Sequence, residues 1–468
     1  MTESTALFAL TSLDGRYQNS TKKLAEYFSE FALIKYRVRA EVEYLLAFAE
    51  ITKVVEISKK DTKKLRDIYL SFSEEDALVV KTHEAKCHHD VKAIEYFLQD
   101  KFRELSCENL IPYIHIGLTS EDTNSVAYGL ALKESRDEIL LPTLWELIEK
   151  LADFVKQHAD LPMLARTHGQ AAVPTTLGKE YAVFLSRLLP EIATLAEQPI
   201  AAKVSGAVGT FAALELAYPK TDWTEFAEKF LDSLDLKADP LSTQIVSPES
   251  YIRLFQNMER INNILLDCAR DSWQYISDGW LVQTVKAGEV GSSTMPQKVN
   301  PIDFENAEGN FGLANALFSH FSDKLPISRL QRDLSDSTVK RSIGSAFGYS
   351  LLGFESLVRG LGKVAPDKVA LKKSLENHPE IIAEGLQTLL RAEGHEDAYE
   401  ALKNVTRGKK MLSTSELQAM TIKLAAGVLT KEKIANLTQE TYTGLATRLA
   451  KETHKLVNNY KKGRKHAK

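Results

Sequence analysis

The stretch Leu140–Val155 reads LLPTLWELIEKLADFV, and its pattern of apolar residues indicates the fold class. These residues recur at steps of three and four, which places them on one face of an α-helix. Pro142 fits the first turn of such a helix, because its missing N–H costs no hydrogen bond there. Strand patterns are scarce elsewhere, so the sequence predicts an all-α protein. The same helical period predicts further long helices at Phe28–Glu50, Glu180–Ala196, Tyr251–Val282, Phe304–His320 and Lys340–Val364.

Breaks between these helices suggest three parts. Gly206 and Gly209 indicate a loop, and Ser247-Pro248-Glu249-Ser250 has the composition of a helix start. One boundary is expected near Ile111-Pro112, and the polar, lysine-rich stretch Val364–Ser374 suggests the other. The predicted division is an N-terminal helical domain (1–111), a central long-helix bundle (112–364) and a C-terminal helical domain (365–468).

The overall composition excludes several classes of partner. The 468 residues carry 59 Lys plus Arg against 63 Asp plus Glu, a net charge of −4, so neither nucleic acid nor a membrane is expected as a partner. The three cysteines cannot form a disulfide framework and suggest a reducing compartment. Without a leader-like start or a long apolar run, a cytoplasmic protein is expected. The basic tail 455–468 suggests either an anion-binding patch or a solvated, frayed terminus, and we favour the frayed terminus.

The segment Gly291–Pro301, GSSTMPQKVNP, combines a mobile glycine, hydroxyls, an ammonium and an amide. Such a set of donors suits a loop that closes over an anion, although a polar loop between helices would look similar. His168 lies beside Gly169 in a stretch bounded by prolines, where an accessible imidazole is suited to proton transfer. A lone histidine is more often structural, so both interpretations stay open here.

Two further segments draw attention. His88-His89-Asp90 invites a metal hypothesis, but adjacent side chains point apart on a helix and no other ligand cluster has metal spacing, so no metal is predicted. The segment His115–Asp122 resembles a loop followed by a helix start capped by Thr119 or Ser120. A helix start of this kind can hold phosphate or carboxylate.

Gly291–Pro301 meets all eight fixed positions of Gly-Ser-Ser-x-Met-Pro-x-Lys-x-Asn-Pro, the signature of the fumarase/aspartase superfamily. Other segments resemble one branch of it, the adenylosuccinate lyase family of the bacterial type. They are Asp14-Gly15-Arg16-Tyr17, Ser71–Ala77, Asp90-Val91-Lys92-Ala93, Thr119-Ser120-Glu121-Asp122, Thr167-His168-Gly169-Gln170, Gln331-Arg332-Asp333-Leu334 and Asp336-Ser337-Thr338-Val339. The resemblance runs from residue 14 to about 341.

The resemblance implies β-elimination of fumarate from adenylosuccinate, giving AMP, and from the succinylated aminoimidazole carboxamide ribotide, in purine nucleotide biosynthesis. By position, Ser292 resembles the general base, although Ser293 stands beside it, and His168 resembles the general acid. Glu305 resembles the carboxylate that orients the histidine. Donors around the substrate carboxylate would stabilise the aci-carboxylate formed when the carbon proton leaves. No organic cofactor or metal is implied, since proton transfers suffice.

The resemblance also implies a set of substrate-binding residues. The nucleotide side would be held by Arg16, Tyr17, Arg332, Ser337 and Arg341, and arginine suits phosphate because its fork makes paired hydrogen bonds. The remaining matched positions are Thr119, Ser120, Gln244, Asn306, the trio His88, His89 and Asp90, and Lys298 and Asn300 for the succinyl carboxylates. Two positions depart from the family form, because His88 replaces an asparagine and Gln297 a histidine. His115 is a candidate for supporting a proton or phosphate contact.

The fold implied is three helical domains around a central bundle, assembled as a homotetramer with active sites shared between subunits. The candidate catalytic segments are more than a hundred residues apart, which an extended bundle cannot easily bring together within one copy. Two alternatives remain: another lyase of the superfamily, such as argininosuccinate lyase or aspartase, or a non-catalytic structural protein like the related lens crystallins. The arginines on the nucleotide side argue against the first alternative, and intact Ser292, His168, Lys298 and Glu305 argue against the second.

Overall fold

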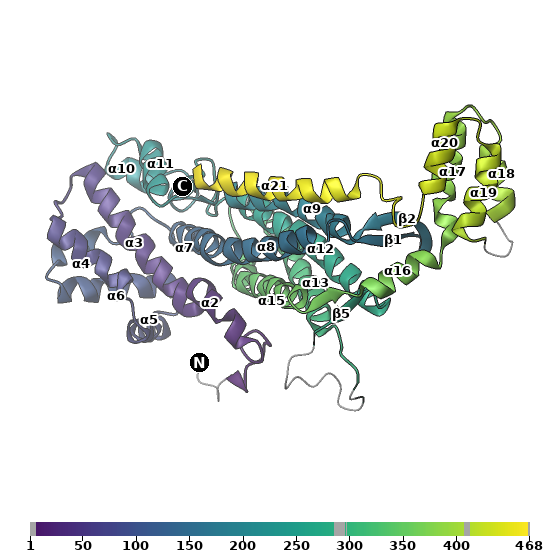
Figure 1. The fold of residues 1–468 in the computed structure, drawn as a ribbon. Coiled ribbons are helices and arrows are strands. Elements are labelled where there is room, and N and C mark those ends of the chain that lie inside the picture. Colours follow the sequence, from purple (N-terminus) through teal and green to yellow (C-terminus); the bar gives the residue numbers. More distant parts are fainter. Residues whose placement is uncertain (1–5, 285–294, 296, 407–411, 467–468) are drawn as a thin grey trace. The chain divides into compact units, whose positions relative to one another are not determined.

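The computed structural model describes residues 6–284, 295, 297–406 and 412–466 of the chain (Figure 1). Contacts divide the chain into two compact units. Unit one comprises 1–144, 191–263 and 309–353, and unit two comprises 145–190, 264–308 and 354–468. The three-domain division at 111 and 364 stays a prediction. Within the described ranges, no helix is both long enough and apolar enough to cross a membrane.

Helices dominate both units, which confirms the all-α prediction. The elements of unit one are α2 (Gln18–Phe28), α3 (Glu30–Thr52), α4 (Lys59–Leu70), α5 (Glu74–Cys87), α6 (Asp90–Glu104), η1 (Glu108–Tyr113), α7 (Ser120–Ser135), η2 (Arg136–Leu140), β3 (Ala201–Ala202), α10 (Ala212–Ala217), α11 (Trp223–Ser233), β4 (Lys237–Ala238) and α14 (Ser335–Lys340). Five helices contribute residues to both units: α8 (Leu141–Gln157), α9 (Leu177–Glu197), α12 (Glu249–Ser277), α13 (Ile302–Lys324) and α15 (Ile343–Leu361).

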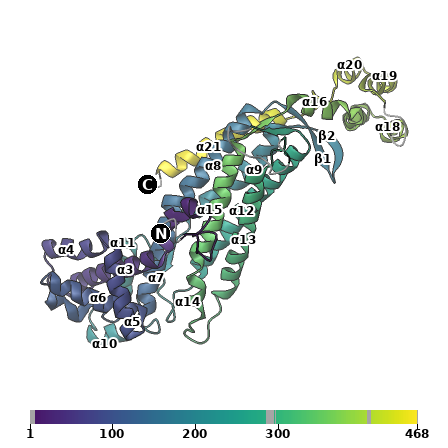
Figure 2. The same ribbon diagram turned by 90° about the horizontal axis from the view of Figure 1, so that it is seen from below.

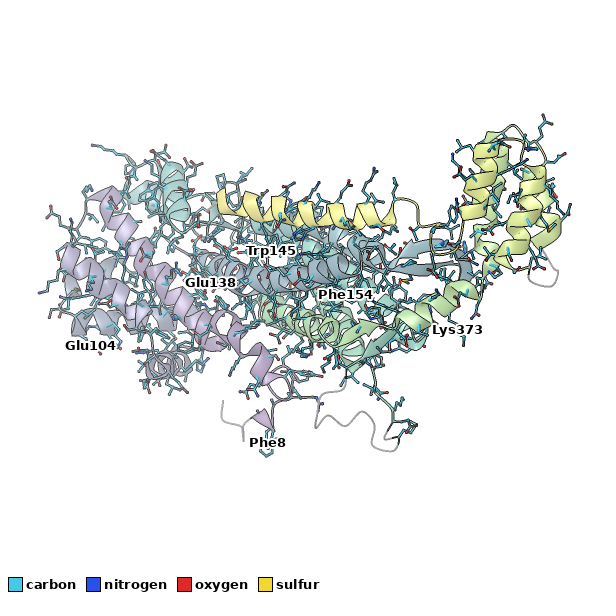
Figure 3. All side chains as sticks on the ribbon, viewed as in Figure 1. Phe8, Glu104, Glu138, Trp145, Phe154 and Lys373 are labelled. Atoms are coloured by element: carbon cyan, nitrogen blue, oxygen red, sulfur yellow. The ribbon has the colours of Figure 1, made fainter. Side chains whose placement is uncertain are left out.

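Unit two adds short strands and a C-terminal group of helices. Its elements are β1 (Pro162–Thr167), β2 (Gln170–Thr176), β5 (Leu281–Gln283), β6 (Val364–Pro366), α16 (Lys368–Glu376), η3 (Pro379–Ile382), α17 (Ala383–Ala392), α18 (Ala398–Thr406), α19 (Thr414–Leu424), α20 (Val428–Asn436) and α21 (Ala446–His466). The ring of Phe154 in α8, labelled in Figure 3, packs 4.5 Å from the ring of Tyr181 in α9. Such aromatic contacts stabilise the packing of neighbouring helices.

The N-terminal helices of unit one enclose a core of their own. Val38 of α3, Leu65 of α4, and Ile94 and Phe97 of α6 are buried together in it. Helix α3 starts cleanly because the Ser29 hydroxyl accepts the backbone N–H of Ala32 at 3.1 Å. This packing fixes the junction between α5 and α6, where the His88-His89-Asp90 trio lies.

The long helices α12, α13 and α15 pack through aromatic side chains in unit one. The ring of Phe318 in α13 lies 5.7 Å from that of Phe255 in α12 and 5.3 Å from that of Phe347 in α15. The three helices run side by side in the ribbon (Figure 2). Gly353 lets α15 approach α13 closely, because a Cβ atom there would meet the Phe311 ring at 2.3 Å. The predicted central long helices are therefore present and tightly packed.

Two predicted helix ends are wrong for one shared reason. The helix expected to reach Val282 ends at Ser277, and the helix expected over Lys340–Val364 is split into α14 and α15 and ends at Leu361. Gly279, at φ +73°, turns the chain out of helix. Strand β5 then pairs antiparallel with β6, with Val282 opposite Ala365. The lysine-rich stretch Val364–Ser374, expected to separate two domains, contains β6 and most of helix α16.

The expectation of a frayed basic tail is also wrong, because α21 continues to His466. Its buried residues Ala446, Ala450 and Val457 are spaced for one helical face. Lys461 donates to Glu149 of α8 at 2.7 Å, and α21 lies alongside α8 in both ribbon views (Figures 1 and 2). The exposed Lys455 therefore lies on the solvent side of a packed helix.

Candidate active site

His168 lies in the tight turn of a β-hairpin that the sequence analysis treated as a loop. Strands β1 and β2 pair antiparallel up to Thr167 opposite Gln170, which leaves His168 and Gly169 as the two turn residues. Both have positive φ, +53° and +73°, as the favoured two-residue hairpin turn requires. The His168 side chain is exposed, and among the described residues it has no hydrogen-bond partner. The hairpin therefore presents the imidazole outward.

Arg166 anchors this hairpin to the end of α12. Its guanidinium donates to Asp278 at 2.8 Å and lies 4.7 Å from the centre of the Trp280 ring. The Trp280 ring is itself stacked on Tyr275 at 5.8 Å. An ion pair combined with a cation–π contact holds the strand that leads to His168.

The candidate base, Ser292, and its neighbour Ser293 lie outside the described residues. Lys298 and Asn300, predicted to bind the succinyl carboxylates, precede the start of α13. Lys298 is exposed, and its backbone N–H donates to the Met295 carbonyl at 3.0 Å. The segment thus presents an ammonium group to solvent just before a helix N-terminus, a favourable place for an anion.

Glu305 and Asn306 lie in the first turns of α13, and both are exposed. The Glu305 carboxylate accepts the indole N–H of Trp273, in α12, at 3.1 Å. Among the described residues there is no hydrogen bond between Glu305 and His168, so the orienting role of Glu305 stays a prediction. Trp273 is a neighbour that the sequence analysis did not identify, and nothing in its surrounding sequence marks it.

Asp90 joins three parts of unit one at the start of α6. Its carboxylate accepts from Arg37 of α3 at 2.8 Å and from Arg341 at 3.2 Å. Burial would raise the pKa of Asp90, but the two arginines outweigh it and hold the pKa below its ordinary value. Asp90 is therefore a carboxylate at neutral pH, and its hydrogen bond helps to hold the Arg341 guanidinium in place.

The neighbours of Asp90 are exposed at the α5–α6 junction. His88 ends α5 with φ +54°, and His89 Nδ1 accepts the backbone N–H of Lys92 at 3.1 Å as the N-cap of α6. The two histidines are thus accessible beside the Asp90 ion pairs.

Arg332 is held by residues of α7 and by Gln244. Its Nη2 donates to Glu121 at 3.0 Å, and its Nη1 lies 3.5 Å from the Gln244 side-chain oxygen. Lys340 is buried beneath it and donates to Glu121 at 3.2 Å and to Asp336 at 2.6 Å. Burial would lower the pKa of Lys340, but the charges of Glu121 and Asp336 raise it above its ordinary value. Two cations and two carboxylates thus balance each other beneath the exposed edge of Arg332.

Thr119 and Ser120 form the start of α7, as predicted. The backbone N–H of Thr119 donates to Asp122 at 2.8 Å, within a capping box. Nearby, His115 Nδ1 lies 2.7 Å from Glu41, which also accepts from Thr123 at 2.6 Å. Burial would lower the pKa of His115, but Glu41 overcomes it and raises the pKa to about 9. His115 is therefore a structural cation beneath the helix start.

Arg16, Tyr17 and Ser337 are also in unit one. Arg16 is exposed, with its guanidinium 6.0 Å from the Tyr17 ring just before α2. Ser337 lies in α14, and its carbonyl accepts the backbone N–H of Arg341 at 3.4 Å. All the residues predicted for the nucleotide are therefore in unit one, whereas His168, Lys298, Asn300, Glu305 and Asn306 are in unit two. Within the described ranges, no group of three His, Cys, Asp or Glu residues could hold a metal ion.

The structure adds three buried residues to the nucleotide side: Glu121, Asn124 and Arg37. Glu121 belongs to a segment quoted above, but only Thr119 and Ser120 were assigned a role there. Arg37 and Asn124 lie within helical stretches without a motif, so no sequence signal points to them. The resulting group of cations over buried carboxylates can bind a multiply charged anion, because guanidinium N–H groups remain available at its exposed edge.

Comparisons with known proteins show what the whole chain is similar to. A family model described as Lyase matches residues 15–314, and one described as Adenylosuccinate lyase C-terminal matches residues 328–443. Adenylosuccinate lyase of Legionella pneumophila strain Philadelphia 1 is 47% identical, covering 96% of this chain and 99% of the relative. Those of Dictyostelium discoideum and Escherichia coli K12 are 45% and 42% identical, covering 94% and 96% of this chain and 97% and 99% of the relatives.

Solved structures share the fold. A fumarate lyase from Mesorhizobium sp. BNC1 has a TM-score of 0.73 at 19% identity, covering 92% of this chain and 97% of its own. The 3-carboxy-cis,cis-muconate lactonizing enzyme from Pseudomonas putida has a TM-score of 0.74 at 17% identity, covering 94% and 98%. At such identities the likeness concerns the fold alone.

Proposed function

This chain belongs to the adenylosuccinate lyase family and is a lyase, and on that premise we propose that it eliminates fumarate from adenylosuccinate to leave AMP. We extend the proposal to the succinylated aminoimidazole carboxamide ribotide, which presents the same succinyl–nitrogen bond. The observation that carries the proposal is near-full-length identity of 42–47% to adenylosuccinate lyases from bacteria and Dictyostelium. This identity argues against argininosuccinate lyase and aspartase as alternatives.

His168 is the proposed general acid that protonates the leaving nitrogen. Its exposure at a rigid hairpin turn supports this role, because the imidazole can reach a substrate without moving buried neighbours. Imidazole is the side chain best suited to give a proton to an amine leaving group near neutral pH. Glu305 is proposed to orient this imidazole.

Ser292 is the proposed base that removes the carbon proton next to the β-carboxylate. The resulting aci-carboxylate carries extra negative charge, and Lys298 and Asn300 are proposed to stabilise it. The exposed ammonium of Lys298, just before α13, supports that assignment. No step in this scheme needs a metal or an organic cofactor.

The nucleotide phosphate is proposed to bind at Arg332 and Arg341, with Arg16, Tyr17 and Ser337 around it. Available guanidinium donors at Arg332 and the half-exposed Arg341 support this placement. Thr119, Ser120, Gln244, His88, His89 and Asp90 complete the proposed surroundings of the substrate.

A homotetramer with shared active sites is the proposed assembly. Apolar side chains stay exposed on three long helices of this single chain, among them Val183 on α9 and Leu313 on α13, with Leu313 53% exposed. Another copy would cover such surface. A second copy would also bring a carboxylate to His168, which has no hydrogen-bond partner among the residues described in one copy. Light scattering of the purified protein tests this, and a fully active monomer would contradict it. Three free cysteines support a cytoplasmic location, which we also infer.

Ultraviolet absorbance of purified protein mixed with adenylosuccinate tests the reaction, with fumarate and AMP identified in the product. We expect conversion without added metal or nucleotide cofactor. A folded protein that converts no succinylated substrate would contradict the proposed activity and favour the structural-protein alternative.

A further inference from the structure

Three buried side chains link the residues proposed to hold the nucleotide. Glu121 accepts from Arg332 at 3.0 Å and from Asn124 at 2.6 Å. Asn124 in turn accepts from Arg37 Nε at 2.8 Å, and Arg37 Nη2 donates to Asp90, also at 2.8 Å. We call Glu121, Asn124 and Arg37 the buried relay.

The relay ends at an arginine on each side. Arg332 sits beyond Glu121, and Arg341 sits beyond Asp90 at 3.2 Å. Both arginines belong to the segment around α14, whereas the relay belongs to α3 and α7. The positions of the two guanidinium groups therefore depend on the same helix pair rather than on α14 alone.

Burial makes this linkage stiff. Glu121, Asn124 and Arg37 are 2%, 8% and 3% exposed, so water cannot replace their partners. Hydrogen bonds to charged groups in such surroundings are stronger and shorter than those at a surface. Lys340 and Asp336 complete the charge balance at Glu121, so the relay does not leave an unpaired charge behind Arg332.

Within the described part of the chain, two nitrogens of Arg332, Nε and Nη1, lack a close hydrogen bond. Its Nε is buried 3.5 Å from Asp336 Oδ1, and neither atom has a hydrogen-bond partner among the described residues. Its contact to Gln244 is at the 3.5 Å limit. Arg332 is thus held at Glu121 through Nη2, while Nη1, with its long contact to Gln244, can turn to a ligand.

We propose that Glu121, Asn124 and Arg37 are positioning residues that hold Arg332 and, through Asp90, Arg341 at a fixed separation for the nucleotide phosphate. The inference rests on the proposed function, which assigns the phosphate to these two arginines. None of the three relay residues is placed against the reacting bond, so they act on binding rather than on proton transfer.

The Arg37→Lys variant tests the hydrogen-bond geometry of Arg37 separately from its positive charge. An ammonium keeps the buried positive charge but cannot reach Asn124 and Asp90 in the fixed fork that Arg37 uses. Glu121→Gln keeps the shape but removes the charge that holds Arg332. The matched control is Arg136→Lys, because Arg136 is a buried arginine of the same unit whose partners, Asp137 and the Gln198 carbonyl, lie outside the site.

The test is the dissociation constant of AMP, with adenosine as the probe that lacks phosphate, measured by calorimetry on the full-length protein. We expect AMP to bind about tenfold more weakly to Arg37→Lys and to Glu121→Gln, since one charged hydrogen bond is worth about that factor. Adenosine binding should stay within about twofold of wild type. The double variant should bind AMP about as weakly as the worse single variant, because both changes break one relay. For turnover of adenylosuccinate, KM should rise while kcat changes little.

AMP affinity within about twofold of wild type in both folded relay variants would overturn the inference. An equal loss in Arg136→Lys would do the same, because it would indicate a general loss of stability. If Glu121→Gln does not fold, Arg37→Lys decides the question alone. Wild-type protein that binds AMP through the relay but turns over no adenylosuccinate would contradict the proposed function and leave the relay in place. Wild-type protein that does not bind AMP would remove the phosphate assignment and the relay's role together.

Discussion

Lys203 and Asp122 form an ion pair in which neither side chain is exposed to solvent. Asp122 also accepts the backbone N–H groups of Ser205 and Gly206, each at 3.0 Å, and that of Thr119 at 2.8 Å. Lys203 donates to the Gly206 carbonyl at 3.0 Å. One buried pair therefore fastens the loop around Gly206 to the start of α7, where Thr119 and Ser120 are proposed to meet the substrate.

Replacing Lys203 with methionine should lower the free energy of unfolding by about 3–5 kcal/mol, because Asp122 would be left as an uncompensated buried charge. Urea unfolding measures this. Lys229→Met is the control, since the Lys229–Glu225 pair is exposed and should contribute little to stability. Equal effects of the two substitutions would contradict the burial argument.

The His115–Glu41 pair predicts a pH dependence of stability. The folded pKa of His115 is about 9, above the value of about 6.5 in an unfolded chain. The pair's stabilisation should be complete below about pH 6.5 and be lost as pH rises through about 9. The difference in unfolding free energy between wild type and His115→Gln should therefore shrink from about pH 6 to about pH 10. A difference that stays constant across this range would argue against a charged His115.

His168→Asn should remove the proposed proton donor without disturbing the hairpin turn. Asn-Gly is a favoured sequence for a two-residue hairpin turn, so thermal stability should be unchanged or slightly higher. Turnover of adenylosuccinate should fall by about a hundredfold or more, because asparagine cannot donate a titrating proton. The same change at His320, an exposed histidine of α13, should leave turnover unaltered. Normal turnover in His168→Asn would remove this residue from the mechanism.

Gly353→Ala tests the close approach of α15 to α13. The added methyl group would overlap the Phe311 ring, and we expect a loss of about 1–3 kcal/mol in thermal or urea unfolding. Adding Phe311→Leu should recover part of that loss, since the smaller side chain makes room. Strictly additive effects of the two substitutions would show that they do not share this space.

The helices were predictable because helix formation is a local property. Apolar residues at steps of three and four identify α8, α9, α12 and α13 from sequence alone, and Pro248-Glu249 indicates the start of α12. The predicted helix ends were wrong where a segment distant in sequence pairs with the chain. Leu281–Gln283 leaves the helical pattern because it pairs with Val364–Pro366, which no local window contains.

The candidate site was predictable only where a motif records it. The segments around His168, Lys298 and Arg332 carry recognisable sequence patterns, whereas Trp273 resembles any other residue of a helix. Its role beside Glu305 depends on the packing of α12 against α13. The prediction of a frayed tail was wrong for a similar reason. The apolar residues of α21 are sparse and interspersed with lysines, and they form a buried face only through packing that includes α8.

The sequence by itself determined the predominantly helical architecture, the lyase signature and the family of the reaction, because period and motif are written in consecutive residues. Only the tertiary structure decided which charged side chains form ion pairs. Arg37, Glu121 and Arg332 come from three distant stretches. Folding brings Arg37 to Asp90 and Arg332 to Glu121, and burial strengthens these ion pairs because less water competes for each group.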